Sequence, residues 1–284
     1  AVHASNGIAI DYIQDKLLAE NADFAKRFLE TSPDIAEAEA IFRAVYLGRL
    51  MKCPVYIPHI SSREGIDVIR YLKSRGIPVF AETCPQYLGL TWDELSGRGP
   101  LGKVGPAVKT KEDQDALWFA MRNGLFDTVG SDHAPKGKKV DEDFFKAAYG
   151  SPEIETMLPV IWQIGVNGGR ITPNDLVRVF SENPAKIFGL FPAKGNLAAG
   201  ADADIVVFDP RERWKITAAE QHTNADYSLF EGMEILGKVR TVIACGDILL
   251  DRGEYRHRAG KGRFLRTAAG QRMPAYMQRR QQGQ

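Results

Sequence analysis

Apolar residues follow a helical spacing at the beginning of the chain. One stripe of such residues predicts a helix over residues 8–18 and consists of Ile10, Ile13, Leu17 and Leu18. A second helix is predicted over residues 34–50, because Pro33 stands near its start, where the fixed backbone angle of proline is well tolerated. The first part of the chain is therefore expected to be helical.

Two short apolar runs follow, and a helix is predicted between them. Residues 54–59 and 77–83 are rich in residues that favour strands. The segment between them predicts a helix that Ser61 or Ser62 caps and that ends near Lys73. Strand, helix and strand at such short intervals are typical of parallel βαβ units with right-handed crossovers. The pattern therefore predicts an α/β fold.

A further amphipathic helix leads towards the most distinctive polar residues of the chain. It is predicted over residues 110–122, with a buried side formed by Ala116, Leu117, Phe119 and Ala120. The helix is expected to end at Gly124, and the apolar run 126–129 predicts the next strand. A small turn after that strand then presents Asp132 and His133.

The charged segment after this turn, residues 136–143, has two open interpretations. It is rich in Lys and Gly, so it forms either a lid over a catalytic rim or a solvated surface loop, and the sequence favours neither. Three helices are predicted beyond it, at residues 154–165, at residues 173–180 and from Asn183 onwards.

From residue 196 the pattern changes to turns and strands. Residues 205–208 predict a strand, and two apolar runs on either side of Cys245 predict a hairpin. So few strands cannot bury both faces of a sheet, and we expect them to pair with strands from elsewhere. The tail, residues 254–284, is basic and has no core pattern; it is expected either to be disordered or to lie across a partner subunit.

Composition and charge argue against several classes of protein. Lys plus Arg (37) nearly balance Asp plus Glu (36) over 284 residues, so no strong field attracts nucleic acid or an anionic membrane. No uninterrupted apolar run approaches the roughly 20 residues of a membrane span. Three scattered cysteines are too few for a disulfide framework and indicate a cytoplasmic protein. The chain starts at Ala1 without a methionine, at what reads as the end of a strand, and a fragment is expected.

Three predicted strand ends carry residues that bind metals: His3, His59 and Asp132. Imidazole and carboxylate are the ligand set of hydrolytic zinc or manganese sites, and a parallel barrel gathers such residues at one rim. Singly, each histidine is more often a hydrogen-bonded structural residue, and Asp132 has the alternative roles of helix cap or ion-pair partner. Their conjunction favours a metal site, in which His133 orients a neighbour and is not itself a ligand.

Several motifs, in order along the chain, resemble those of one family. They are His3-Ala4-Ser5-Asn6-Gly7, Tyr56-Ile57-Pro58-His59-Ile60-Ser61-Ser62, Glu82-Thr83-Cys84-Pro85-Gln86-Tyr87-Leu88, Gly130-Ser131-Asp132-His133-Ala134-Pro135, Asn183-Pro184-Ala185-Lys186, Gly200-Ala201-Asp202-Ala203-Asp204 and Glu231-Gly232-Met233-Glu234. Together they resemble the dihydropyrimidinases and hydantoinases, the cyclic amidohydrolases of the amidohydrolase superfamily. The resemblance runs from the first residue to about Gly262.

The resemblance implies a fold and a division into domains. Residues 1–195 are expected to form the C-terminal half of a (β/α)8 TIM-type barrel, and residues 196–253 part of a small β-sandwich domain. Residues 254–284 then form a basic C-terminal tail. Members of this family assemble into dimers and tetramers, so a homo-oligomer is expected, with neither nucleic acid nor membrane as a partner.

The resemblance also implies a reaction, the metal-dependent opening of a small cyclic amide or imide to an N-carbamoyl amino acid. It assigns His3 and His59 to one metal, and Asp132 to the other metal and to general base and acid catalysis. Two zinc ions are implied, with manganese as the alternative. The ring's amide groups are expected to bind main-chain atoms near Gly105 and Tyr149, where the family usually has serine and asparagine.

Some residues of the family have no counterpart in this chain. A His-x-His pair, a carbamylated lysine that bridges the two metals and a tyrosine that stabilises the oxyanion cannot be located, so impaired activity is expected. Three alternatives stay open: a non-catalytic scaffold protein of the same fold, a related allantoinase or dihydroorotase, and a truncated chain without a function of its own. The three retained ligands argue against the scaffold.

Overall fold

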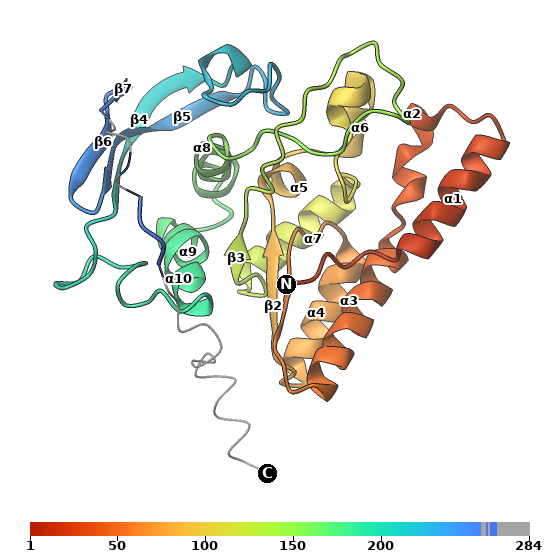
Figure 1. The fold of residues 1–284 in the computed structure, drawn as a ribbon, viewed down its shortest axis with the longest axis horizontal. Helices are drawn as coiled ribbons and strands as arrows, with labels where there is room; N and C mark the ends of the chain where they lie inside the picture. The colour runs from red at the N-terminus through yellow and green to blue at the C-terminus, as the bar shows by residue number, and fades with distance from the viewer. Residues whose placement is uncertain (257–259, 261, 266–284) are drawn as a thin grey trace.

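The structure is a computed structural model, and it describes residues 1–256, 260 and 262–265. Most of the predicted basic tail, residues 254–284, therefore lies outside the described residues. Figure 1 shows helices around a small central sheet, and a second sheet at one side of the molecule.

The central sheet is parallel and has the strand order β1 (Val55–Ile57), β2 (Val79–Thr83), β3 (Thr128–Val129). Val55 pairs with Val79, and Glu82 pairs with Thr128. Helices α4 (Arg63–Ser74) and α7 (Lys111–Arg122) lie in the connections between successive strands. This arrangement confirms the predicted parallel βαβ units and the α/β class.

The N-terminal part consists of α1 (Gly7–Ala19), α2 (Phe24–Arg27), the 3-10 turn Phe28–Thr31 and α3 (Asp34–Leu50). Both helices predicted in this part are confirmed, and α3 has the predicted bounds. Residues 1–6 are extended but form no strand. Their one main-chain hydrogen bond to β1 joins the amide nitrogen of Val2 to the carbonyl oxygen of Tyr56 at 2.9 Å. This contact still places His3 beside the end of β1.

The remaining helices are short. They are α5 (Pro85–Gly89), α6 (Trp92–Leu95), the 3-10 segment Ser96–Gly102, α8 (Met157–Ile161), the π-helical turn Trp162–Asn167, α9 (Pro173–Val177), the π-helical turn Arg178–Glu182 and α10 (Asn183–Ile187). The helix predicted from residue 154 thus begins at Met157. None of the described helices is long and apolar enough to cross a membrane.

The second sheet is antiparallel, with the order β4 (Ile205–Lys215), β5 (Glu234–Ala244), β6 (Asp247–Asp251), β7 (Glu254–Tyr255), and the 3-10 turn Ala218–Glu220 follows β4. The predicted hairpin is confirmed: Cys245 and Gly246 form its turn with φ of +50° and +86°, the left-handed values that two-residue hairpin turns require. Among the described residues this region contains one sheet, so the β-sandwich stays a prediction.

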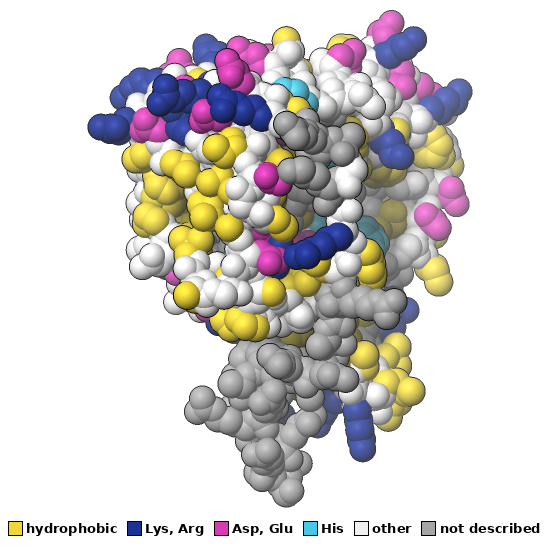
Figure 2. All heavy atoms as spheres, turned by 60° about the vertical axis from the view of Figure 1, so that its left-hand side comes forward, with side chains coloured by type: hydrophobic (Ala, Val, Ile, Leu, Met, Phe, Trp, Pro, Cys, Tyr) yellow, Lys and Arg dark blue, Asp and Glu magenta, His cyan; other side chains and the backbone are white. Residues whose placement is uncertain are grey.

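One hydrophobic core connects the helices with the central sheet. On α7, Leu117, Trp118 and Met121 are buried. Phe119, which the helical pattern placed on the inner side, is 55% exposed, so that part of the prediction is wrong. By contrast, the second sheet leaves apolar side chains at the surface, among them Val206, and Figure 2 shows hydrophobic side chains gathered on this side of the molecule.

Candidate active site

The structure brings two of the predicted metal ligands together. His3 belongs to the extended residues before α1, and His59 follows β1. The Nδ1 atom of His3 and the Nε2 atom of His59 are 2.8 Å apart, and the ring centroids are 4.6 Å apart in an edge-on arrangement. Two imidazole nitrogens from distant parts of the chain therefore face each other.

The backbone conformation and the pKa of His59 are both unusual for a histidine. Its φ is +44°, in the left-handed region that a residue with a Cβ seldom adopts. Burial and, to a smaller extent, the neighbouring His3 together lower the pKa of His59 to about 4. Above that pH the His59 ring is neutral, so its nitrogen lone pair is available to a metal ion.

A buried carboxylate fixes the turn that follows His59. Glu37 of α3 accepts hydrogen bonds from the main chain of Ser61 at 3.0 Å and of Ser62 at 2.9 Å, and from both hydroxyl groups. Ser62 also caps α4, as predicted, by accepting from the nitrogen of Gly65. A Cβ at Gly65 would lie 2.6 Å from the Glu37 carboxylate, so the glycine leaves room for this cluster.

The third predicted ligand, Asp132, lies at the end of β3 and also has a left-handed φ, of +49°. The residue as a whole is exposed, but its carboxyl group is sufficiently enclosed for burial to raise its pKa to about 6. The charge of Glu82 acts in the same direction. The side-chain amide of Gln86 donates to Asp132 at 3.4 Å.

Asp132 does not join the two histidines in one cluster. Within the described ranges, no group of three or more His, Cys, Asp or Glu residues is close enough to hold a metal ion. The reason is the strand order: His59 follows β1 and Asp132 follows β3, with β2 between them. Two strand spacings of about 4.8 Å separate their positions. His3 and His59 thus lie together and Asp132 lies apart from them, and the assignment of the three residues as metal ligands stays a prediction.

Glu82 of β2 lies between these two strand ends. Its carboxylate accepts hydrogen bonds from the Tyr56 hydroxyl at 2.5 Å and from the Thr128 hydroxyl at 3.3 Å. Burial raises the pKa of Glu82. A Cβ at Gly130 would lie 2.5 Å from its carboxyl carbon, so only glycine fits there without a shift. The sequence showed Glu82 within a motif but gave it no role.

His133 anchors a neighbouring segment. Its Nδ1 atom accepts a hydrogen bond from the nitrogen of Ile154 at 3.1 Å, and its main chain forms an isolated bridge with Ser151. The ring and the main chain of His133 thus contact Ile154 and Ser151, respectively. That His133 also orients Asp132 stays a prediction.

The pocket next to the histidine pair contains the predicted substrate-binding residues. It has a volume of about 290 Å³ and is lined by His3, Ser5, Ile10, Gln14, Phe28, Thr31, Ser32, Gly105, Pro106, Ala107 and Tyr149. Gly105 and Tyr149 thus lie in one pocket with His3. This volume suits a small ring compound.

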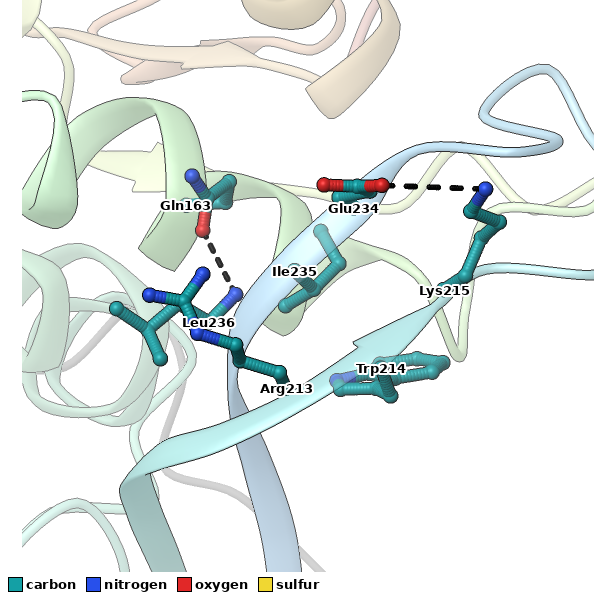
Figure 3. A pocket seen from close by; sticks show the side chains of 7 residues that line it. All are labelled: Gln163, Arg213, Trp214, Lys215, Glu234, Ile235 and Leu236. Atoms are coloured by element: carbon teal, nitrogen blue, oxygen red, sulfur yellow. Dashed lines mark hydrogen bonds and ion pairs between the residues drawn. The ribbon is translucent and has the colours of Figure 1, made fainter.

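A groove over the second sheet is a poorer candidate. Figure 3 shows this groove, of about 420 Å³, between β4 and β5. Its polar groups bind one another: Gln163 accepts from the nitrogen of Leu236 at 2.9 Å, and Lys215 lies 3.9 Å from Glu234. The described side chains that line it include no histidine or cysteine. The candidate site is therefore the pocket beside His3.

Comparisons with known proteins identify the family of the chain. The profile of the family described as "Amidohydrolase family" matches residues 56–249. The D-hydantoinase of Ralstonia pickettii is 39% identical over 273 residues, which cover 93% of this chain and 60% of that protein. The L-hydantoinase of Paenarthrobacter aurescens is 35% identical and is covered to 58%.

Solved structures give the same result. The dihydropyrimidinase from Brevibacillus agri NCHU1002 superposes with a TM-score of 0.91 at 36% identity, over 96% of this chain and 61% of that chain. The chain therefore spans about 60% of the length of the relatives that it matches.

Proposed function

The chain belongs to the amidohydrolase family, and on this basis we propose that the whole protein hydrolyses cyclic amides with the help of metal ions. The predicted resemblance to dihydropyrimidinases and hydantoinases is confirmed over about 60% of their length. The observation that carries the proposal is the facing pair of His3 and His59 beside a pocket of ring size.

The donor set suits divalent metal ions. His3 and His59 would hold one ion through the two nitrogens that face each other, and Asp132 would hold a second. Two zinc ions are the proposed occupants, with manganese as the alternative. Bound there, such ions make a water molecule more acidic and polarise the carbonyl group of the substrate.

Asp132 is the proposed general base and acid. Its pKa of about 6 makes it a stronger base than an ordinary aspartate, yet it is mostly ionised at pH 7. It would take a proton from the water that attacks the ring carbonyl carbon, and return it to the ring nitrogen as the C–N bond breaks. The product is an N-carbamoyl amino acid, which contains all the atoms of the ring and of one water molecule.

The fold neighbours support a wider proposal. We infer that β1, β2 and β3 belong to a (β/α)8 barrel within residues 1–195, and that residues 196–253 belong to a separate β domain. A homo-oligomer is part of the same proposal.

Metal analysis and ring opening test the proposed function together. We expect about two zinc or manganese ions and the opening of hydantoin or dihydrouracil in a longer protein that contains this chain, and impaired activity in this chain alone. The variants His3→Ala and His59→Ala should lose metal and activity. The control is His222→Ala, because His222 is an exposed residue that binds Glu155 and does not line the pocket. Unchanged metal content in His59→Ala would contradict the assignment.

A further inference from the structure

A carboxylate and two hydroxyl groups form a polar cluster across the central sheet. Each strand contributes one residue: Tyr56 from β1, Glu82 from β2 and Thr128 from β3. The Tyr56 hydroxyl lies 2.5 Å from the Glu82 carboxylate and 2.6 Å from the Thr128 hydroxyl. The Thr128 hydroxyl in turn donates to the same carboxylate at 3.3 Å. This Tyr56–Glu82–Thr128 cluster connects all three strands, and the proposed reaction makes no use of it.

The groups around Glu82 favour its charged form, although burial opposes it. Burial raises the pKa of Glu82, whereas hydrogen bonds from Tyr56, from Thr128 and from the main chain of His59 act in the opposite direction. Burial and the charge of Glu82 raise the pKa of Tyr56 well above its ordinary value, so the phenol keeps its proton and donates. Because burying a carboxylate is costly, stability alone does not explain why Glu82 stands at this place.

On one side, Glu82 and its neighbour hold the turn that carries His59. The carbonyl oxygen of Glu82 accepts from the nitrogen of Ile60 at 2.8 Å, and its side chain accepts from the main chain of His59. The Thr83 hydroxyl donates to the carbonyl oxygen of Ile60 at 2.9 Å. The left-handed φ of His59, +44°, persists only where surrounding groups hold it. The end of β2 supplies such groups.

On the other side, Glu82 packs against the turn that carries Asp132. A Cβ at Gly130 would lie 2.5 Å from the carboxyl carbon of Glu82 and 2.6 Å from each carboxyl oxygen. The nitrogen of Gly130 donates to the carbonyl oxygen of Thr83 at 3.0 Å. Asp132 follows two residues later, with its own left-handed φ of +49°. Glu82 thus lies between two constrained turns, each of which carries a proposed metal ligand.

We propose that Glu82 is a positioning residue, whose carboxylate, held by Tyr56 and Thr128, fixes the positions of His59 and Asp132 relative to each other. This inference rests on the proposed function, because it takes His59 and Asp132 to be metal ligands. Glu82 does not itself line the pocket beside His3. Its role is to keep the two strand ends in place.

Zinc affinity tests this role in the longer protein that contains this chain. The dissociation constant for zinc is measured by competition with a coloured chelator. Glu82→Gln keeps the size of the side chain but replaces two acceptor oxygens with one oxygen and one amide group. We expect zinc to bind about tenfold more weakly. The visible spectrum of the cobalt-loaded variant should also change, because it depends on the arrangement of the ligands. An unchanged affinity together with an unchanged spectrum would overturn the proposal.

Asp127 provides the matched control for a merely structural effect. Its carboxylate is mostly buried, lies 2.6 Å from the ammonium nitrogen of Lys73 and accepts from the nitrogen of Ala81 at 2.8 Å. Asp127 precedes β3, whereas Asp132 follows it. Asp127→Asn should therefore lower the free energy of unfolding but leave zinc affinity within about twofold of the wild type. Equal losses of affinity in Asp127→Asn and Glu82→Gln would refute the positioning role.

The two hydroxyl groups give a finer test. Thr128→Ser keeps the hydroxyl and should bind zinc as the wild type does, whereas Thr128→Val removes it and should bind zinc about threefold more weakly. Tyr56→Phe removes two contacts and should weaken zinc binding by about fivefold. The same affinity in Thr128→Ser, Thr128→Val and Tyr56→Phe would refute the claim that the cluster holds Glu82.

The outcomes also distinguish this inference from the proposed function. If the wild type binds zinc without opening any ring, and Glu82→Gln weakens zinc binding, the positioning role stands and hydrolysis is refuted. If the wild type opens rings, and Glu82→Gln changes neither zinc affinity nor the cobalt spectrum, hydrolysis stands and the positioning role is refuted. A wild type that binds no metal ion would refute both.

Discussion

The two sheets of this molecule differ in how deeply their polar groups are buried. In the central sheet nearly every strand residue is buried, and the carboxylate of Glu82 is matched by the hydroxyl groups of Tyr56 and Thr128. In the second sheet most strand residues are exposed or half-buried, and Glu212 pairs with Lys238 and Arg240 near solvent. The comparison teaches that buried polar groups, and with them shifted pKa values, gather around the central sheet.

The difference predicts unequal costs for similar substitutions. A buried polar group that loses its partner retains the full cost of its removal from water, whereas an exposed one binds water instead. Substitutions around the central sheet should therefore lower the free energy of unfolding by several kcal/mol at most sites, and those in the second sheet by less than about 1 kcal/mol.

The largest effect is expected at Glu37. The variant Glu37→Gln replaces an acceptor of four hydrogen bonds with a group that has one acceptor oxygen and two donor hydrogens. We expect a loss of about 3 kcal/mol in the free energy of unfolding, measured with urea. Glu39→Gln on the same helix is the matched control, because Glu39 pairs with Arg43 at the surface and should lose less than about 0.5 kcal/mol. Equal costs for the two variants would show that the cluster adds nothing.

The next effect is expected at Gly130. Gly130→Ala places a methyl group where Glu82 lies, so that either the strand end or the carboxylate must move. The expected loss is about 2 kcal/mol in the free energy of unfolding. Gly137→Ala serves as the control, because a Cβ at Gly137 would meet nothing within 4 Å. A Gly130→Ala protein as stable as the control would mean that Glu82 is free to move.

The pH dependence of stability tests the two perturbed groups in the metal-free chain. The lowered pKa of His59, about 4, makes the unfolded state bind the proton first, so its contribution to stability falls as the pH falls from about 6.5 to 4. The raised pKa of Asp132, about 6, acts oppositely, because between pH 6 and about 4 the folded state binds more protons.

The effects of His59 and Asp132 on the pH dependence of stability therefore cancel in part. The variant Asp132→Asn should show the effect of His59 alone. Urea unfolding of this variant should become more sensitive to acid between pH 6 and 4, by about 1 kcal/mol after allowance for partial exposure. His59→Gln should be less sensitive to acid than the wild type. Identical profiles for all three proteins would contradict both shifts.

Local signals in the sequence predicted much of the fold. The bounds of α3 and the cap of α4 are confirmed, because Pro33 and Ser62 act within one helical turn. The prediction that Phe119 is buried was wrong. Phe119 lies at the edge of the apolar stripe of its helix, and contacts with neighbouring elements decide whether a residue at such an edge is covered. In the structure Arg70 lies over the exposed ring of Phe119 at 6.0 Å.

Some contacts in the candidate site could not be predicted, because they join residues that are distant in the sequence. His3 lies beside His59 although residues 1–6 form no strand, and Glu37, from helix α3, accepts hydrogen bonds from Ser61 and Ser62, which precede helix α4. The segment 136–143 had two interpretations; most of its residues are exposed, but Lys138 is buried and donates to the carbonyl oxygen of Lys103. A charged residue in a Lys- and Gly-rich run gives no sign that main-chain carbonyl oxygens will surround it.

The smallest effect is expected in the second sheet, at Glu212. Its carboxylate lies 2.7 Å from Arg240 and 3.4 Å from Lys238, distances similar to those in the buried clusters. Water nevertheless screens the pair, so Glu212→Gln should cost less than about 1 kcal/mol, and the cost should shrink further in 1 M salt. Glu234→Gln, whose partner Lys215 is 3.9 Å away and exposed, is the control with no measurable cost. A loss at Glu212 as large as that at Glu37 would mean that distance, and not burial, decides these energies, and the contrast between the two sheets would fail.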